Sequence, residues 1–208
     1  MGNLITQIDN GANRQDGLTA RHHPRYRALS FLRGTAMPFF PSLPDNANVG
    51  DLFEIKPDFR ESFSAFSEAT MRGESAFSIG ERELIAAYTS ALNSCDYCYG
   101  GHAAIAKQHG VGENVFDALI DDLELAPVDD KLKPILRYIK KLTLDPYKML
   151  QADADAVFDA GWDEAALADA IWVCARFNMM NRLTLGHGLN ADPAAFEERA
   201  KAMQYNKK

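Results

Sequence analysis

Apolar side chains recur every three or four residues from about residue 57 to the C-terminal end of the chain. This spacing places them on one side of an α-helix and is typical of amphipathic helices that pack on a core. No stretch shows sustained alternation of apolar and polar residues, the pattern of a half-buried β-strand. The sequence therefore predicts an all-α protein, with helices expected over residues 59–72, 78–92, 94–109, 115–123, 132–142, 152–160, 163–186 and 193–203.

The first fifty residues differ from this helical pattern. Residues 1–24 are rich in Asn, Gly, Gln, Asp and Arg and show no apolar period, as expected of an extended arm. Residues 37–44 hold three prolines, which rule out a regular helix. Because they also carry two phenylalanines and a leucine, we expect an ordered loop packed on the core or across a subunit boundary. The predicted organisation is an N-terminal arm and Pro-rich loop over 1–50, followed by one helical domain over 51–208.

The composition is that of an ordinary globular domain, with 208 residues, 47% of them hydrophobic and 25% charged. The net charge of -7 disfavours nucleic acid and anionic membranes as partners of the whole chain. Residues 1–35 depart from this balance, because they contain five arginines and only two acidic residues, Asp9 and Asp16, which gives a net charge of about +3. The arm is therefore expected either to lie on an acidic surface of its own or a neighbouring subunit, or to be a solvated tail.

The sequence also bears on location. No apolar run approaches the roughly 18 residues of a membrane span, and the N-terminus lacks the basic and long apolar regions of a signal peptide. Three cysteines, two of them in a C-x-x-C pair, suit a reducing compartment and a functional pair of thiols. We therefore expect a cytoplasmic protein.

The segment that carries candidate chemistry has C-x-x-C-x-x-x-H spacing, formed by Cys95, Cys98 and His102. With Asn93 or Ser94 as the predicted N-cap, the motif occupies the first two turns of a helix and its three side chains share one face. The positive end of the helix dipole stabilises a thiolate, the histidine is placed to exchange a proton with Cys98, and the two cysteines are close enough to form a disulfide. A redox cycle is therefore available locally.

A second candidate lies one helix earlier. Ser78 and Glu81 have the spacing of a capping box, which accounts for Glu81. Glu83 has no such role and stands beside the apolar stripe of the same predicted helix. A carboxylate at the edge of a buried face needs a partner, so Glu83 is a candidate site residue.

Glu83, an interval of eleven residues, Cys95-x-x-Cys98, three residues and His102 together resemble the alkylhydroperoxidase D (AhpD) branch of the carboxymuconolactone decarboxylase-like superfamily. Residues 177–183 are similar to a helix of its peroxidase-related members. The resemblance implies an all-helical, homo-oligomeric antioxidant enzyme with peroxiredoxin activity and without metal, haem or another cofactor.

The resemblance also implies roles for the residues. Cys98 would be the peroxidatic thiol, Cys95 the resolving thiol, and Glu83 with His102 a proton relay. Tyr97 stands where some members carry a second histidine. The substrate would be an organic hydroperoxide or hydrogen peroxide, and an external dithiol, either a lipoyl group or a thioredoxin-like protein, would reduce the enzyme.

Other uses of the same residues are open from the sequence. Two thiolates and an imidazole are zinc ligands, with His109 or Glu83 as the possible fourth. The pair could also act as a disulfide oxidoreductase without peroxide, or as the sensor of a redox-sensing or binding oligomer. Cys174 is expected to be a core residue, and His22, His23 and His187 are interpreted as surface histidines.

Overall fold

The computed structural model describes residues 37–190 and 192–202 of the chain. The arm over residues 1–36, with His22 and His23, lies outside the described residues. Since the description begins inside the predicted N-terminal segment, the boundary at residue 50 stays a prediction. Within the described ranges all regular structure is helical, which confirms the predicted all-α class.

The helices are α2 (Val49–Ile55), α3 (Arg60–Arg72), α4 (Ile79–Leu92), α5 (Asp96–Gln108), α6 (Asn114–Asp121), α7 (Leu132–Leu144), α8 (Gln151–Asp159), α9 (Glu164–Gly186) and α10 (Phe196–Ala202). The helices from α3 onward follow the predicted order, whereas α2 was not predicted. Four 3-10 turns, η1 (Pro57–Phe59), η2 (Leu123–Leu125), η3 (Pro146–Lys148) and η4 (Pro193–Ala195), connect them. No described helix is long and apolar enough to cross a membrane.

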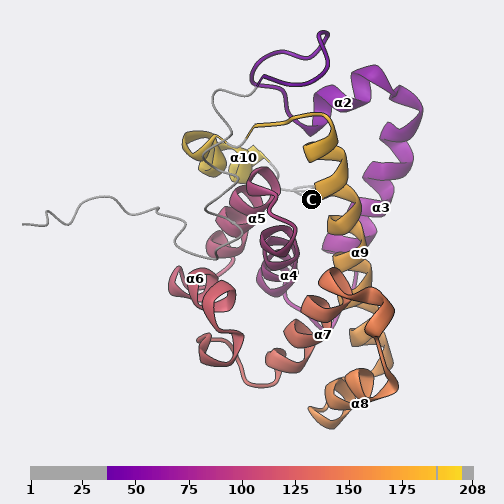
Figure 1. Ribbon diagram of the computed structural model, residues 1–208, viewed down its shortest axis with the longest axis vertical. Coiled ribbons are helices and arrows are strands. Elements are labelled where there is room, and N and C mark those ends of the chain that lie inside the picture. Colours follow the sequence, from indigo (N-terminus) through magenta and orange to yellow (C-terminus); the bar gives the residue numbers. More distant parts are fainter. Residues whose placement is uncertain (1–36, 191, 203–208) are drawn as a thin grey trace, which may run out of the picture.

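Helix α4 is the centre of the fold, with α5 beside it and α9 behind and to its right in Figure 1. The side chains of α4 are buried around almost the whole helix, including the polar residues Glu83, Thr89 and Ser90. A helix surrounded by protein on all sides is expected to be apolar all round. The polar residues of α4 therefore need partners on the neighbouring helices.

Of the predicted helix caps, the one at the start of α4 is observed and the one at the start of α5 is not. The capping box at the start of α4 is confirmed, since Glu81 N donates to Ser78 Oγ (3.2 Å) and Ser78 N donates to Glu81 Oε2 (2.8 Å). The predicted N-cap of α5 is wrong, because Cys95 itself is the cap. Ser94 adopts a left-handed conformation with φ 55°, which turns the chain sharply between α4 and α5 and moves the helix start by one residue.

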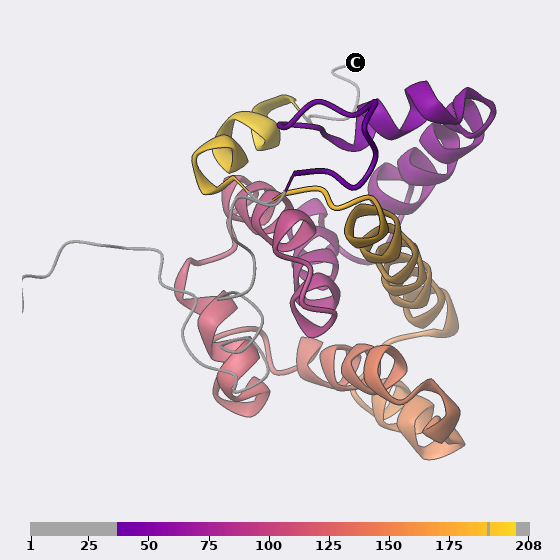
Figure 2. The ribbon, with the colours of Figure 1, turned by 45° about the horizontal axis from the view of Figure 1, so that its top comes forward.

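The Pro-rich segment lies at the C-terminal end of α9, where Leu43 is buried as predicted but Phe39 and Phe40 stay exposed. Phe39 N donates to His187 O (3.0 Å), and the ring of Phe40 stacks on the His187 ring with centroids 4.5 Å apart. Leu43 is buried with Ala47, Leu52 and Leu189. His187 is therefore no isolated surface histidine, because it holds this segment against α9. Figure 2 shows the indigo segment running beside the end of α9.

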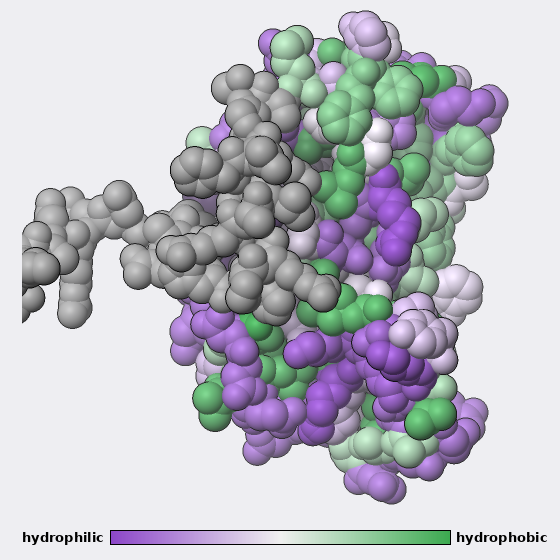
Figure 3. Space-filling model, viewed as in Figure 1, coloured by the Kyte–Doolittle hydropathy of each residue, from purple (hydrophilic) through white to green (hydrophobic). Residues whose placement is uncertain are grey.

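The surface is mixed in polarity. On the face shown in Figure 3, apolar residues lie between groups of hydrophilic ones. Helix α9 contributes exposed apolar side chains at Trp172, Met179 and Leu183, spaced seven and four residues apart on one face. This face is distinct from the side of α9 that packs on α4 and α5.

Candidate functional site

Cys95 and Cys98 lie at the turn between α4 and α5, directly beneath the surface. Cys95 is the N-cap residue of α5 and Cys98 is the third residue of the helix. Cys95 N donates to Ser90 O (2.9 Å), which holds the turn against the last part of α4. Both cysteines are free thiols, Cys95 with 0% and Cys98 with 5% of its surface exposed. The predicted pair is thus assembled at the positive end of a helix.

A threonine of α9 contacts both sulfur atoms. Thr184 Oγ1 lies 3.2 Å from Cys95 Sγ and 3.5 Å from Cys98 Sγ, and its side chain is fully buried. The sequence analysis did not identify this residue. The sequence marks Thr184 only by its place three residues after Asn181, on the same face of α9. Its contact with the sulfur atoms follows from the packing of α9 on α5.

Amide and hydroxyl groups fix the turn that carries the cysteines. Asn181 Nδ2 donates to Ser90 Oγ (3.0 Å), and Asn93 Nδ2 donates to Asn181 Oδ1 (2.9 Å). Asn181 lies in the segment 177–183 that resembled a peroxidase-related helix, but its contacts had not been predicted. These bonds join α9 to the C-terminal end of α4, directly before the turn, and so position Thr184 near the sulfur atoms.

The pKa values of the two thiols are shifted in opposite directions. Hydrogen bonding from the Cys98 thiol lowers the pKa of Cys95 to about 7, aided by Thr184 and opposed by burial. The same hydrogen bond, together with burial, raises the pKa of Cys98 well above the usual range of a thiol. The pair therefore loses its first proton near neutral pH, and the negative charge rests on Cys95.

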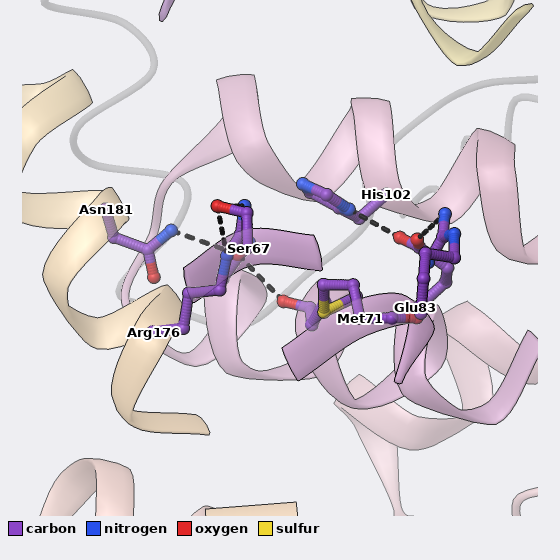
Figure 4. Close-up of polar contacts among 9 residues, drawn as sticks. Ser67, Met71, Glu83, His102, Arg176 and Asn181 are labelled. Atoms are coloured by element: carbon purple, nitrogen blue, oxygen red, sulfur yellow. Dashed lines mark hydrogen bonds and ion pairs between the residues drawn. The ribbon is translucent and has the colours of Figure 1, made fainter. Parts of the chain in front are cut away.

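Glu83 and His102 form the second part of the site. Glu83 Oε2 lies 2.6 Å from His102 Nδ1, and Glu83 Oε1 accepts from Arg72 Nη2 (2.7 Å). The carboxylate is fully buried, which by itself raises its pKa; the charges and hydrogen bonds of His102 and Arg72 outweigh burial and lower the pKa of Glu83 overall. Figure 4 shows Glu83 and His102 facing each other. The partner that the sequence required for Glu83 is thus a histidine together with an arginine from the last turn of α3.

The contact with Glu83 determines what His102 can do. With the proton of Nδ1 directed at the carboxylate, Nε2 carries the lone pair and can act as a base. Within the described residues no hydrogen bond joins the imidazole to either sulfur atom. His102 follows Cys98 by four residues, however, so the two side chains are neighbours on one face of α5. Helix α5 therefore carries a member of each part of the predicted site, Cys98 of the dithiol and His102 of the Glu83–His102 pair.

A buried arginine lies on the far side of the histidine. Arg176 Nε and Nη2 donate to Ser67 Oγ at 3.2 and 3.1 Å, and the guanidinium stands 4.6 Å from the Phe177 ring centre. The same phenylalanine packs edge-on against His102 with ring centres 4.4 Å apart. Figure 4 shows Arg176 and Ser67 on the side opposite Glu83. Phe177 thus contacts both the guanidinium and the imidazole.

Two of the remaining sequence interpretations can be compared with the structure. Cys174 is fully buried beside Thr143 Oγ1 (3.3 Å), as expected of a core residue, and burial raises its pKa. For zinc, the possible fourth ligand His109 is exposed, while Glu83 is bonded to Arg72 and His102. Over residues 37–190 and 192–202, no three His, Cys, Asp or Glu side chains are grouped to hold a metal ion.

The fold and the site define a helical protein with a buried dithiol beside a carboxylate–histidine pair. Residues 57–137 match the carboxymuconolactone decarboxylase family. A comparison with curated protein sequences gave no match.

Two solved structures share the fold. The first is an alkylhydroperoxidase AhpD core, an uncharacterized peroxidase-related protein from Ralstonia eutropha JMP134, with 24% identity and a TM-score of 0.66 over 77% of this chain and 95% of the other. The second is an uncharacterized peroxidase-related protein from Silicibacter sp. TM1040, with 24% identity and a TM-score of 0.63 over 82% and 94%. The partial family match and the shared fold support the resemblance to the AhpD-like group of the carboxymuconolactone decarboxylase superfamily that was found in the sequence.

Proposed function

We propose that this protein is a thiol-dependent hydroperoxide reductase with peroxiredoxin-type activity. The observation that carries the proposal is the dithiol: Cys95 and Cys98 share one buried hydroxyl, the pKa of Cys95 is about 7, and a Glu83–His102 pair lies one helical turn away. A thiol pair ionised at neutral pH next to a histidine base is suited to attack on a weak O–O bond. The peroxidase-related structural neighbours are consistent with this chemistry.

Cys98 takes the role of the attacking thiol. Cys98 has the larger exposed fraction of the two residues, 5% against 0%, and its side chain neighbours His102. Its thiolate bonds to the outer oxygen of the hydroperoxide, and the O–O bond breaks as the pair of electrons leaves with the inner oxygen. A proton completes the alcohol or water, and Cys98 becomes a sulfenic acid.

Cys95 then completes the cycle. Its thiolate attacks the sulfur of the sulfenic acid, the S–S bond forms, and hydroxide leaves to become water with one more proton. Two electrons from the thiols have then reduced the peroxide. An external dithiol, either a lipoyl group or a thioredoxin-like protein, returns both cysteines to thiols by exchange.

Glu83 and His102 supply the proton transfers. His102 Nε2 accepts the proton that the dithiol releases when it ionises and gives it to the alkoxide, while Glu83 stabilises the imidazolium through Nδ1. Arg72 keeps Glu83 ionised, so that the carboxylate retains the negative charge that this role needs. The homo-oligomeric state and cytoplasmic location belong to the same proposal.

A thiol count tests the proposal. Anaerobically reduced protein receives one equivalent of cumene hydroperoxide, and free thiols and remaining peroxide are measured; the expected result is loss of two thiols and of the peroxide. In Cys95→Ser a sulfenic acid on Cys98 should be trapped by dimedone, whereas Cys98→Ser should form none. Three persistent thiols with unreacted peroxide would contradict the proposal, and a trapped sulfenic acid on Cys95 alone would reverse the two roles.

A disulfide oxidoreductase is the second candidate. A pKa of about 7 also suits thiol–disulfide exchange, whose optimum lies near ambient pH. This reading predicts rapid exchange with lipoamide or a protein disulfide and no peroxide loss in the same preparation. Lactone decarboxylation, the activity in the family's name, would proceed in Cys95→Ser/Cys98→Ser protein, because that reaction does not consume a dithiol.

A further inference from the structure

The threonine between the two sulfur atoms has more hydrogen-bond neighbours than it can donate to. Thr184 Oγ1 lies 3.1 Å from Met180 O and 3.2 Å from Asn181 O, in addition to its contacts with Cys95 and Cys98. A hydroxyl has one proton to donate and two lone pairs that accept. Its proton must therefore be directed either at the helix backbone or at one sulfur atom, and the ionisation of the pair decides which.

The two states of the pair favour different orientations. When both cysteines are thiols, the hydroxyl can donate to the carbonyl of Met180 and accept from a thiol. When Cys95 is a thiolate, a hydrogen bond to a charged acceptor is about twice as strong as one between neutral groups. The Thr184 proton then turns toward Cys95, 3.2 Å away, and the oxygen can accept from the Cys98 thiol when that thiol rotates from Cys95 toward Thr184.

We infer that Thr184 relays a proton between the two cysteines and thereby moves the thiolate from Cys95 to Cys98. The Cys98 proton passes to Thr184 Oγ1 while the hydroxyl proton of Thr184 passes to Cys95 Sγ. One S–H bond breaks, one forms, and the hydroxyl is restored, so that no charge leaves the pair. The attacking form of Cys98 is produced without placing a second negative charge in the buried site.

This relay answers a difficulty in the proposed function, on which its role in turnover rests. The resting charge lies on Cys95, which is fully buried, whereas Cys98 is the residue with an exposed fraction, 5%. Full ionisation of both thiols is opposed by burial and by the first charge. An exchange of the proton across Thr184 does not require both thiols to be ionised. The buried position of the hydroxyl excludes competing water.

The test uses alkylation, so its outcome does not depend on peroxide turnover. Reduced protein is treated with a limiting amount of iodoacetamide, and mass spectrometry gives the ratio of label on Cys98 to label on Cys95. The thiolate absorbance is titrated in parallel. Thr184→Val removes the hydroxyl at nearly constant volume, and Thr184→Ser retains it. The matched control is Thr143→Val, which removes the similar hydroxyl 3.3 Å from Cys174 Sγ.

In Thr184→Val we expect the Cys98 share of the label to fall about tenfold, because after the exchange the hydroxyl donates to the Cys98 thiolate and this charged hydrogen bond is lost, whereas the Cys95 thiolate still accepts from the Cys98 thiol. Thr184→Ser should restore the ratio, and Thr143→Val should leave it unchanged. A wild-type ratio in Thr184→Val overturns the relay even if the titration midpoint moves, since direct exchange between the sulfur atoms would then suffice. If the valine variant does not fold, Thr184→Ala provides the same comparison.

Discussion

Helix α9 is involved in two buried thiol environments that look alike locally and differ in chemistry. Near the middle of the helix, Cys174 Sγ lies 3.3 Å from Thr143 Oγ1; near its C-terminal end, Thr184 Oγ1 lies 3.2 Å from Cys95 Sγ. Burial raises the pKa of Cys174, whereas the pKa of Cys95 falls to about 7. A threonine hydroxyl alone therefore does not produce a reactive thiol in this protein.

The difference comes from what else surrounds each sulfur. Cys95 accepts a hydrogen bond from a second thiol and caps the positive end of α5, while Cys174 lies inside a helix, where burial outweighs the hydrogen bonds from Thr143, Thr89 and Asn178. Only the first environment can hold the charge that ionisation creates. The comparison indicates that the C-x-x-C spacing supplies acidity as well as a disulfide partner.

The largest expected contrast is between serine replacements in the two environments. Cys98→Ser should reduce peroxide consumption to the rate without protein, because the attacking sulfur is lost. Cys174→Ser should keep the wild-type rate, since its sulfur is fully buried and takes no part. Peroxide loss is followed under anaerobic conditions with excess dihydrolipoamide. Equal losses of peroxide consumption in the two variants would contradict the assignment of the reactive sulfur to Cys98.

A second contrast tests the buried ion pair beside the dithiol. Glu83→Gln removes the charge that holds His102 Nδ1 and Arg72, and the peroxide-reduction rate should fall by about 10²–10⁴, the usual share of general acid–base catalysis. Loss of one partner of a buried pair should also cost about 3–5 kcal/mol in the free energy of unfolding.

The matched control is Glu113→Gln, which breaks the exposed pair with Lys107. Its free energy of unfolding and its rate should both stay at the wild-type values. Urea unfolding and peroxide kinetics on the same preparations give both quantities. A Glu83→Gln protein that is destabilised but fully active would assign Glu83 to the core alone.

At neutral pH, the alkylation rates of the Cys95–Cys98 pair and of Cys174 should differ by about two orders of magnitude. Below pH 7 the pair is a dithiol, and above it the pair holds one thiolate, so labelling of the pair should rise with pH through a midpoint near 7. The pKa of Cys174 is raised above 9.0, which leaves about 1% or less of this residue as thiolate at neutral pH. Iodoacetamide labelling resolved by mass spectrometry measures both, and a midpoint near 9 for the pair would contradict the assignment.

The sequence predicted the helices and half of the site, for reasons that differ between residues. The apolar period identified the helices because buried faces repeat at 3.6 residues, and Glu83 was found because a carboxylate next to such a face needs a partner. Arg72 and Thr184 were missed, since they come from α3 and α9 and no local pattern distinguishes them. Thr184 lies 86 and 89 residues from the two cysteines that it contacts. The cap of α5 was misplaced because the left-handed Ser94 follows from packing.

The smallest expected effect concerns two neighbouring glycines of α5, the helix that carries the reactive pair. A Cβ added at Gly100 would lie 2.0 Å from the ring of Phe196, whereas one at Gly101 would meet nothing within 4 Å. Gly101→Ala should stabilise the protein by about 0.5–1 kcal/mol through helix propensity. Gly100→Ala should destabilise it by about 1–3 kcal/mol, because α10 must shift away from α5.

The same two variants show whether α10 shields the dithiol. If α10 limits access to the start of α5, Gly100→Ala should label faster at the Cys95–Cys98 pair while Cys174, which lies on the other side of α9, stays unlabelled at neutral pH. Gly101→Ala should label at the wild-type rate. Urea unfolding and iodoacetamide labelling together give the answer. Faster labelling of all three cysteines would instead indicate general loosening, and the two thiol environments would then differ only in acidity and not in access.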